Sequence, residues 1–448
     1  MKKVILIGSN HAGTAAANTL LANYPDCKLT IFDRNSNISY LGCGTALWVG
    51  RQIDGYGSLF YSSPEALESK GATVHMETAI EHIDFDKKVV CAKDKNGKEI
   101  KQDYDALILA TGSLPIIPKL PGLDLPGVEC VKLFQDGQRI DCELHDPEVN
   151  SVAIVGAGYI GVELAEAVKR RGKKALLFEA QNTCLSTYYD EEFCADMDEV
   201  LKKGGVELHY GEMVQEIKGG GASGRVSGIV TNKGEYQVDL VIMAIGFRPN
   251  TALGEGHIKK AEGSGAYCVD LQQQTNIPDV YAIGDCATVY SNALQAPAYI
   301  ALATNAVRSG VVAAYNVEGT PLKSSGVQGS NGICIFDYKM VSTGLNVNAA
   351  KKAGFDPVVT SFKDLQKPAF ITHDNGEVKI RIIYDRKTRR VLGAQLASYQ
   401  DISMGIHMFS LAIEQSITID QLKLLDIFFL PHFNQPYNYI TMAALTAE

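Results

Sequence analysis

Cys43 is the residue whose sequence surroundings best suit redox chemistry. It stands between two glycines in the stretch Leu41-Gly42-Cys43-Gly44, and these glycines leave its sulfur unshielded. The chain has 10 cysteines, and no two of them fall into a CxxC, CxxxxC or Cys/His metal spacing. A low-pKa thiolate without a partner thiol can cycle to sulfenate and back, whereas a nearby second thiol would trap the sulfenate as a disulfide. The alternative for Cys43 is a structural thiol, the usual role of a buried cysteine in a large reduced protein.

A nucleotide-binding unit is predicted directly before Cys43. An apolar strand at residues 4–8 leads into Gly8-Ser9-Asn10-His11-Ala12-Gly13, a helix to about residue 24, and a strand that ends at Asp33. Glycines let a pyrophosphate approach the backbone, the helix N-terminus supplies N–H groups, and the acid binds ribose hydroxyls. Asn10 occupies the usual place of the middle glycine, so this motif alone is weak evidence for a nucleotide.

A second unit carries the full glycine motif. A strand at residues 151–155 leads into Gly156-Ala157-Gly158-Tyr159-Ile160-Gly161 and a helix, and the next strand ends at Glu179. A carboxylate at that place accepts hydrogen bonds from a free ribose 2′-hydroxyl and repels a 2′-phosphate, which indicates NADH rather than NADPH. The predicted NADH contacts are Gly156, Gly158, Tyr159, Ile160, Gly161, Glu163, Glu179 and Gly246.

Two later turns belong with the first unit. Thr111-Gly112-Ser113 ends a buried strand, and Gly284-Asp285 follows another strand and precedes a small-residue helix expected at 298–314. Two nucleotide units with two such turns indicate FAD as the hydride partner of NADH, with Asp285 near its ribityl and pyrophosphate part. The predicted FAD contacts are Gly8, Asn10, His11, Ala12, Gly13, Asp33, Cys43, Thr111, Gly112, Ser113, Gly284, Asp285 and Ala303.

The order of these motifs predicts an α/β fold with two Rossmann-like domains and a C-terminal α+β domain. The FAD-binding domain comprises residues 1–115 and 246–322, and the NAD-binding domain, 116–245, is inserted into it. The C-terminal domain, 323–448, carries strands near 333–336, 378–384 and 391–397 and helices at 403–415 and 419–425, and an oligomer interface is expected there. Residues 219–224 are expected to form a hairpin-like turn rather than a phosphate loop.

Composition limits the partners. The net charge is −9, which gives no reason to expect nucleic acid or an anionic membrane. The first apolar run is too short for a signal peptide, and no apolar run is long enough to span a bilayer, so a cytoplasmic protein is expected. No metal site is predicted.

Together, these motifs resemble the NADH oxidase, NADH peroxidase and CoA-disulfide reductase branch of the pyridine nucleotide-disulfide oxidoreductases. Within it, the stretches at 10–14, 41–48 and 430–434 are similar to those of the water-forming NADH oxidases. The resemblance implies bound FAD, a C-terminal dimerisation domain and thus a homodimer, Cys43 as the non-flavin redox centre, and His11 beside that cysteine.

The reaction implied by this resemblance is the reduction of O₂ to two waters by two NADH. Reduced flavin alone yields peroxide, and the Cys43 thiolate then attacks the O–O bond and becomes a sulfenate, which a second NADH reduces. NADH peroxidase is the nearest competing function, and residue spacing does not separate the two. CoA-disulfide reductase is a third enzyme with these motifs, and a redox-sensing protein without turnover would belong to a different class.

Several site residues have two possible roles. His11 is either an ordinary helix-start residue or a proton donor to oxygen intermediates. Tyr159 either packs in its helix or covers the flavin until the nicotinamide displaces it. Glu163 is either a solvated charge or a neighbour of the nicotinamide. His432 and Tyr437 are either ordinary interface residues or reach the partner subunit's flavin.

Overall fold

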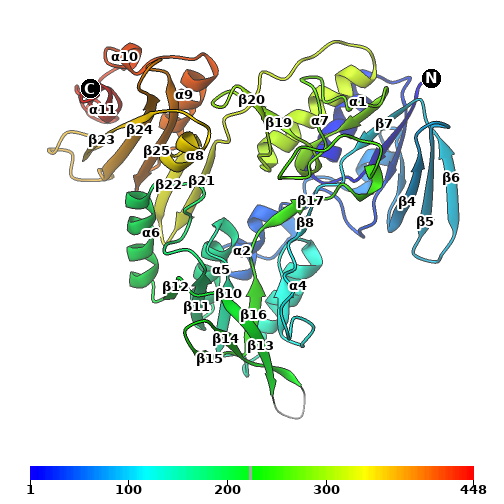
Figure 1. Ribbon diagram of the computed structural model, residues 1–448, viewed down its shortest axis with the longest axis horizontal. Helices are drawn as coiled ribbons and strands as arrows, with labels where there is room; N and C mark the ends of the chain where they lie inside the picture. Colours follow the sequence, from blue (N-terminus) through cyan, green and yellow to red (C-terminus); the bar gives the residue numbers. More distant parts are fainter. Residues whose placement is uncertain (221–223) are drawn as a thin grey trace.

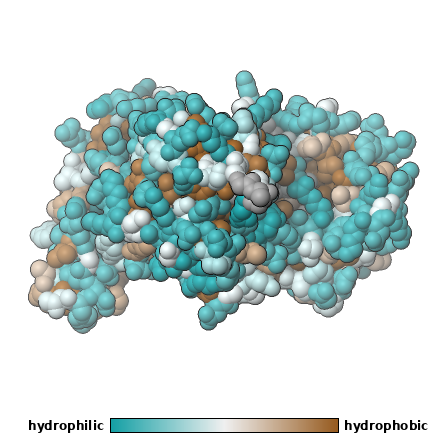
Figure 2. All heavy atoms as spheres, turned by 90° about the horizontal axis from the view of Figure 1, so that it is seen from below, coloured by the Kyte–Doolittle hydropathy of each residue, from teal (hydrophilic) through white to brown (hydrophobic). Residues whose placement is uncertain are grey.

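The computed structural model describes residues 1–220 and 224–448. Figure 1 shows three lobes: the first holds the N-terminus and helices α1 (His11–Asn23) and α7 (Ala303–Val317), the second lies below it around α5 (Tyr159–Arg170), and the third holds the C-terminus. The chain enters the second lobe near residue 115, returns to the first near residue 247, and ends in the third. Figure 2 shows one face of the molecule, where hydrophilic residues dominate and hydrophobic residues form small groups between them.

The first lobe is built on a parallel sheet with strand order β18-β7-β1-β2-β3. Its apolar strands are covered on both faces, as expected for parallel strands. On one face, Val4 and Leu6 pack in a core shared with residues of α1 and α7. On the other face, Ile5 and Ile7 pack in a core shared with residues of a smaller sheet, β4-β5-β6. The elements of this lobe are β1 Lys3–Ile7, α1 His11–Asn23, β2 Lys28–Phe32, η1 Gly42–Gly44, α2 Thr45–Val49, η2 Gly57–Leu59, α3 Pro64–Glu68, β3 Thr73–His75, β4 Thr78–Asp84, β5 Val89–Asp94, β6 Glu99–Asp103, β7 Ala106–Leu109, β8 Ser113–Pro115, β17 Phe247–Pro249, η3 Ala252–Gly254, β18 Val280–Ala282, η4 Gly284–Cys286, β19 Val289–Ser291, β20 Ala296–Ala298 and α7 Ala303–Val317.

Helices α1 and α7 lie against one another because small residues face each other. A Cβ on Gly310 would stand 2.3 Å from the carbonyl oxygen of Ala12, so only glycine fits there. Helix α7 begins at Ala303 and not at residue 298 as expected, since residues 296–298 pair with β19 as β20.

The second lobe repeats the arrangement with a parallel sheet of order β12-β11-β10-β16-β9. Strands β13 and β14 pair antiparallel, and residues 221–223 of the expected turn at 219–224 lie outside the described residues. The elements are β9 Val128–Cys130, α4 Phe134–His145, β10 Ser151–Val155, α5 Tyr159–Arg170, β11 Lys174–Glu179, α6 Glu191–Lys203, β12 Glu207–Tyr210, β13 Val214–Gly220, β14 Arg225–Thr231, β15 Glu235–Gln237 and β16 Leu240–Met243.

The third lobe is an antiparallel sheet of order β21-β22-β25-β24-β23 with helices packed against it. The strands and helix expected in this lobe are present, except that the short second helix ends at Leu422 rather than at 425. The elements are β21 Asn331–Ile335, β22 Tyr338–Gly344, α8 Val347–Lys352, β23 Pro357–Leu365, β24 Glu377–Asp385, β25 Val391–Ser398, α9 Ser403–Glu414, α10 Ile419–Leu422 and α11 Tyr439–Leu445. No helix among the described residues is both long and apolar enough to cross a bilayer.

Candidate functional site

The first nucleotide site lies where β1 ends and α1 begins. Gly8 has a φ of +95°, and a Cβ on Gly13 would stand 2.0 Å from the Gly8 carbonyl oxygen, so both positions require glycine. Asn10 has a φ of −84°, a conformation open to any residue, so the backbone of this turn does not require a glycine there. The first turn of α1 presents backbone N–H groups without intrahelical partners, and these suit a pyrophosphate.

Asp33 is held at the end of β2 beside this turn. Its Oδ2 accepts hydrogen bonds from the Ser9 backbone N–H at 2.8 Å and the Ser9 hydroxyl at 2.7 Å, and its Oδ1 accepts one from the Asn35 N–H. Ala12 packs inside the lobe beneath the turn, against Gly284, whose own Cβ would stand 2.9 Å from that of Ala12. The predicted residues of the motif at 8–13, Asp33 and Gly284 are thus brought to one edge of the sheet.

A second group of polar side chains gathers around Asp285. The Ser113 hydroxyl donates to its Oδ2 at 2.8 Å, and the Lys132 ammonium lies 3.4 Å from the same oxygen and 4.4 Å from the centre of the Phe247 ring. The Tyr299 hydroxyl is buried and has no hydrogen-bond partner among the described residues, and burial and the charge of Asp285 both raise its pKa. An orphaned donor beside a lysine and a carboxylate fits a polar ring system such as the flavin and ribityl chain of FAD.

Three more predicted FAD residues are Thr111, Gly112 and Ala303. The Thr111 hydroxyl donates to the Asn250 carbonyl at 2.6 Å, while Gly112, with a φ of +68°, faces open space. Ala303 is the exposed first residue of α7, so a second helix N-terminus begins beside Tyr299. Lys132 and Tyr299 were missed from the sequence because neither lies in a glycine motif; they come from segments preceding α4 and α7.

The second nucleotide site lies where β10 ends and α5 begins. A Cβ on Gly161 would stand 1.8 Å from the Gly156 carbonyl oxygen, and a Cβ on Gly156 would stand 2.5 Å from the Ala244 oxygen. At Gly158 a Cβ would meet nothing within 4 Å, so this glycine leaves space above the helix N-terminus. That space fits the pyrophosphate of a dinucleotide. Gly246, with a φ of +104°, lies in the short connection between β16 of the second lobe and β17 of the first lobe.

Glu179 ends β11 beside that turn in the same way that Asp33 ends β2. Its Oε2 accepts a hydrogen bond from the Ala157 N–H at 2.8 Å, and its Oε1 accepts one from the Gln181 N–H at 2.9 Å. The carboxylate is held at the place expected for the adenosine ribose, so the chain's own groups fit NADH.

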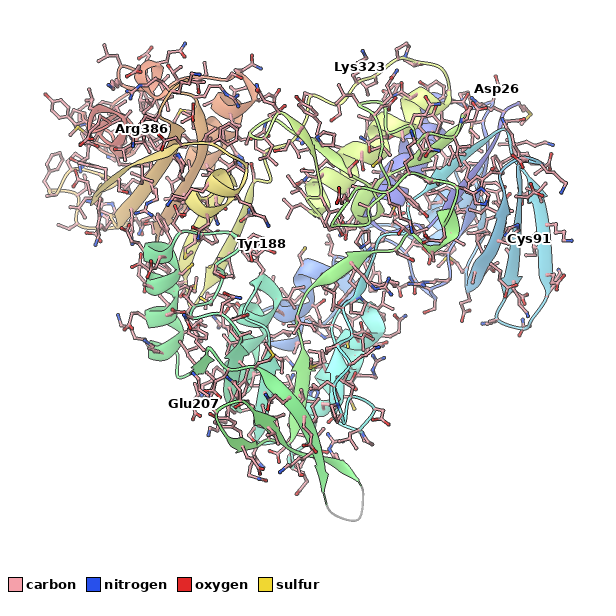
Figure 3. All side chains as sticks on the ribbon, viewed as in Figure 1. Asp26, Cys91, Tyr188, Glu207, Lys323 and Arg386 are labelled. Atoms are coloured by element: carbon pink, nitrogen blue, oxygen red, sulfur yellow. The ribbon has the colours of Figure 1, made fainter. Side chains whose placement is uncertain are left out.

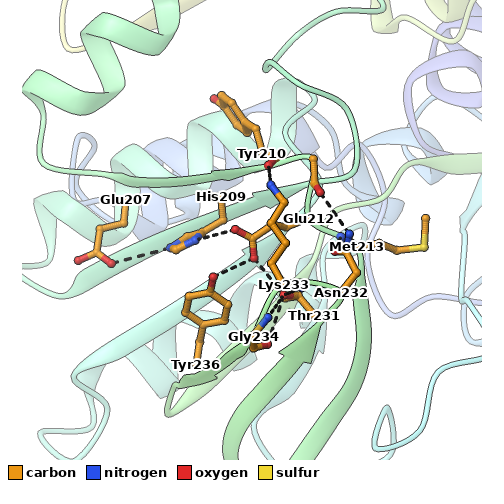
Figure 4. A network of polar contacts seen from close by, with 11 residues as sticks. Glu207, His209, Tyr210, Glu212, Met213, Thr231, Asn232, Lys233, Gly234 and Tyr236 are labelled. Atoms are coloured by element: carbon orange, nitrogen blue, oxygen red, sulfur yellow. Dashed lines mark hydrogen bonds and ion pairs between the residues drawn. The ribbon is translucent and has the colours of Figure 1, made fainter.

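A polar network supports the strand next to Glu179 (Figure 4). The Glu212 N–H donates to the Glu179 carbonyl, and the Glu212 carboxylate accepts from the Tyr236 hydroxyl at 2.9 Å and the Thr231 hydroxyl at 3.0 Å. His209 Nδ1 lies 3.4 Å from Glu212, and its ring stacks on Phe178 at 4.5 Å. Because the network joins β12, β14 and β15, it fixes the edge from which Glu179 projects.

Cys43 lies in η1, the single turn before α2, and opens into a cavity of about 350 Å³. Helix α2 packs on α5 of the second lobe, where a Cβ on Gly50 would stand 3.0 Å from the Ala167 Cα. The cavity therefore lies between the lobes and is lined by residues of all three: Cys43, Ala46, Leu47, Gln52, Glu163, Glu166, Gly332, Ile333, Cys334, Lys339, Val341, Asp401, Ile402 and Ser403.

All 10 cysteines are free. Cys91, for example, lies on β5 in the outer sheet of the first lobe (Figure 3). The spacing along the chain did not reveal that Cys334, on β21, lines the same cavity as Cys43. Cys43 thus has no neighbour thiol in sequence, but it shares a cavity with one from the third lobe.

The expectation of a low pKa for Cys43 is wrong for the groups that this chain supplies. The surrounding protein desolvates the sulfur and raises its pKa, and the charge of Glu163 raises it further, while the N–H groups of Cys43 and Gly44 lower it only in part. Burial and Glu166 raise the pKa of Glu163 itself to about 7, so this carboxyl is half-protonated near neutral pH. Glu163 is therefore a partly buried acid that faces the same cavity as Cys43, not a solvated helix charge.

Tyr159, the first residue of α5, contacts the third lobe. Its hydroxyl lies 2.9 Å from the Tyr189 hydroxyl and is within hydrogen-bonding distance of the Asn331 side-chain oxygen, and its ring lies 4.4 Å from that of Tyr188. Tyr188 extends between the second and third lobes (Figure 3). Ile160 lies beside Tyr159 and packs against the core of the second lobe. Covering of the flavin by Tyr159 stays a prediction.

His11 is the first residue of α1, and its Nδ1 lies 2.9 Å from the Tyr61 hydroxyl. Asp285 and Lys132 are close enough to act on its charge in opposite directions, and burial lowers its pKa. His11 is thereby placed with the polar group around Asp285. His432 and Tyr437 lie in the segment between α10 and α11, and their contact with a partner subunit stays a prediction.

Comparisons with known proteins agree with this geometry. The model of the pyridine nucleotide-disulphide oxidoreductases matches residues 2–310, and the model of their dimerisation domain matches residues 330–438. The chain is 57% identical over 447 residues to the NADH oxidase of Lactococcus lactis subsp. cremoris and 52% identical over 460 residues to that of Streptococcus pyogenes, each alignment covering 100% of both chains.

Among solved structures, the chain is similar to the water-forming NADH oxidase from Lactobacillus brevis bound to NADH. The TM-score is 0.96 at 36% identity, and the match covers 99% of this chain and 98% of that one. These findings confirm the resemblance inferred from the motifs and the predicted fold class. The chain is an oxidoreductase that belongs to the pyridine nucleotide-disulphide oxidoreductase family.

Proposed function

We propose that this protein is an FAD-dependent NADH oxidase that reduces O₂ to two waters with two NADH, through a thiolate and sulfenate cycle of Cys43. The observation that carries the proposal is the position of Cys43: it opens into a cavity where the three lobes meet, and both Cys43 and Cys334 of that cavity are free thiols. The relatives named NADH oxidase and the solved water-forming enzyme support it.

FAD bound in the first site would supply the chemistry of hydride acceptance from NADH and electron transfer to oxygen. The chain's own residues bind and orient the two nucleotides. Glu179 accepts hydrogen bonds from the adenosine ribose, and the open space at Gly158 receives the pyrophosphate on the N-terminus of α5. Asp33 accepts hydrogen bonds from the adenosine ribose of FAD in the same way. Asp285, Ser113 and Lys132 hold the ribityl end of FAD.

Cys43 prevents release of peroxide. Its sulfur attacks one peroxide oxygen, the S–O bond forms as the O–O bond breaks, and the other oxygen leaves as hydroxide, which becomes water with one proton. The two electrons and the proton of a second hydride then convert Cys–SOH to thiolate and water. Because the protein raises the pKa of Cys43, the thiolate must be stabilised by the η1 backbone N–H groups and by the bound cofactor.

The proposed enzyme is a cytoplasmic homodimer. Large apolar side chains are exposed in the last segment of the third lobe, and a second copy of this chain would bury them: Phe428, Phe429, Leu430, Phe433 and Tyr437. This segment ends within the region matched by the dimerisation-domain model. The 10 free thiols suit a reducing compartment.

The decisive experiment measures NADH and O₂ consumption by the purified FAD-loaded protein, with O₂ and H₂O₂ supplied in separate reactions. Two NADH consumed per O₂ indicate water, and one NADH per O₂ indicates peroxide. NADH oxidation that occurs only when H₂O₂ is added would overturn the oxidase proposal in favour of a peroxidase.

A further inference from the structure

Tyr61 is tied to His11 by two contacts. The Tyr61 hydroxyl lies 2.9 Å from His11 Nδ1, and the two rings are parallel to within 3°, with centres 5.8 Å apart. His11 begins α1, whereas Tyr61 follows η2, so the pair joins two segments 50 residues apart. A hydrogen bond and a ring stack together fix both the rotation of the imidazole and the nitrogen that faces Tyr61.

The segment that carries Tyr61 also runs beside Cys43. The Leu41 N–H donates to the Leu59 carbonyl at 2.8 Å, and Tyr40 and Phe60 form a β-bridge, so the two segments are paired immediately before Cys43 and Tyr61. A charge on Cys43 acts on the Tyr61 hydroxyl, which places the two side chains in one electrostatic environment. Tyr61 is 47% exposed, so its other side meets solvent.

Protonation states follow from these surroundings. Burial raises the pKa of Tyr61 to about 12, with a further contribution from Cys43 and an opposing hydrogen bond from Thr14, so the hydroxyl keeps its proton at neutral pH. Burial lowers the pKa of His11; Lys132 lowers it as well, and only Asp285 raises it. A neutral imidazole has one protonated nitrogen, and a tyrosine that donates to Nδ1 leaves the proton on Nε2.

We propose that Tyr61 is a positioning residue for the Cys43 reaction: it holds His11 with its proton on Nε2 and supplies a proton from solvent through the imidazole. The inference rests on the proposed thiolate and sulfenate cycle. It identifies a residue of the proton path that no sequence motif contains.

The Cys43 thiolate attacks H₂O₂, the S–O bond forms, and the O–O bond breaks with its electron pair on the departing hydroxide. The hydroxide takes the Nε2 proton while Nδ1 takes the Tyr61 proton, so His11 stays neutral and changes tautomer. Water has a pKa of about 15.7, far above that of a tyrosine near 12, so this transfer is downhill. Solvent then returns a proton to the exposed tyrosine, and the imidazole regains its first tautomer by releasing its Nδ1 proton to solvent and taking one up on Nε2.

Tyr61→Phe tests the proposal because it keeps the ring stack and removes only the hydroxyl. Tyr56→Phe is the matched control, since Tyr56 is 44% exposed and packs on Trp48 and Phe134 rather than on His11. The FAD-loaded proteins are reduced with a thiol, desalted, and treated without NADH. Oxidation of Cys43 by H₂O₂ is followed by mass spectrometry after sulfenate trapping, and alkylation by iodoacetamide is followed in parallel.

Alkylation by iodoacetamide needs the thiolate, but its leaving group is iodide and needs no proton. It therefore distinguishes loss of the proton supply from a change in the amount or reactivity of the Cys43 thiolate. We expect Tyr61→Phe to slow oxidation by H₂O₂ about tenfold or more, the range of a lost proton donor, while alkylation keeps its rate and pH profile. Tyr56→Phe should change neither rate. Tyr61→Phe combined with His11→Gln should be no slower than His11→Gln alone, because the two residues act as one unit.

Two results would overturn the inference: an unchanged oxidation rate in Tyr61→Phe, or equal slowing of oxidation and alkylation, which would mean that Tyr61 only shapes the thiolate's surroundings. If instead the proposed sulfenate cycle itself is wrong, the experiment gives a different result. In that case Cys43 of the unmodified protein forms no sulfenate with H₂O₂, whatever residue 61 is.

Discussion

Glu179 accepts a hydrogen bond from the backbone N–H of Ala157 at 2.8 Å, and Asp33 accepts one from the N–H of Ser9 at the same distance. Each carboxylate is therefore fixed to the glycine turn of its own nucleotide site. The charge stands at a defined position beside the turn, at the place expected for the adenosine ribose. For Glu179 we expect this charge to repel a 2′-phosphate.

Replacement of Glu179 should weaken the preference for NADH. In Glu179→Ala the repulsion of the 2′-phosphate and the ribose hydrogen bonds are both lost, so we expect the ratio of kcat/KM for NADH over NADPH to fall about tenfold or more. Steady-state kinetics with both nucleotides measure the ratio. Glu216→Ala, at an exposed position of β13, is the control. An unchanged ratio would remove the basis for assigning NADH to this site.

Replacement of Cys43 should change the product rather than stop the reaction. In Cys43→Ser the serine hydroxyl does not form a sulfenate, so NADH oxidation continues and H₂O₂ accumulates, and consumption falls from two NADH per O₂ toward one. Coupled oxygen-electrode and peroxide assays follow both quantities. Cys91→Ser, on the outer sheet, should still form water. Water formation by Cys43→Ser would refute the sulfenate cycle.

Neutralising Glu163 should make the Cys43 thiol more acidic. Its charge raises the pKa of Cys43, so Glu163→Gln should lower that pKa and increase iodoacetamide alkylation at pH 7–8 by about two- to tenfold. Glu148→Gln, on the exposed loop after α4, should leave the alkylation profile unchanged. An identical profile for Glu163→Gln would show that the two side chains do not interact through the cavity.

The same substitution should change stability with a defined pH dependence. Glu163 has a folded-state pKa of about 7, above its ordinary value of 4.5, so its ionisation destabilises the folded protein as the pH rises through that range. Glu163→Gln should therefore be more resistant to urea than the unmodified protein at pH 8, by about 1–2 kcal/mol, and equal to it near pH 4. A difference that is larger at pH 4 contradicts the direction of this shift.

Two glycines of one motif should behave differently. At Gly161 a methyl group would meet the Gly156 carbonyl at 1.8 Å, so Gly161→Ala should cost about 1–3 kcal/mol of unfolding free energy or more. At Gly158 the space is open, so Gly158→Ala should keep the melting temperature and raise the KM for NADH severalfold, because the methyl group occupies the pyrophosphate space. Thermal denaturation and kinetics on the two variants separate these effects. Equal losses of stability would contradict the assignment of Gly158 to the nucleotide.

The sequence alone determined the two nucleotide units. Their glycines, helix starts and terminal acids are close in sequence, and the steric demands that fix them, such as those at Gly13 and Gly161, involve residues a few positions away. Alternating short apolar strands and helices likewise indicated the parallel sheets of the first two lobes, and the change of pattern after residue 323 indicated a third lobe. These properties depend on residues close together in the sequence, so they can be predicted from a single sequence.

Tertiary structure alone decided how the candidate redox site is composed. Lys132 and Tyr299 reach Asp285, Cys334 reaches the cavity of Cys43, and Tyr61 reaches His11, each across tens to hundreds of residues and outside any motif. The pKa of Cys43 was also misjudged from the sequence, because desolvation and the charge of Glu163 depend on the packing of α2 against α5. Burial and charge–charge distances are set by the packing of the three lobes, and no local pattern encodes them.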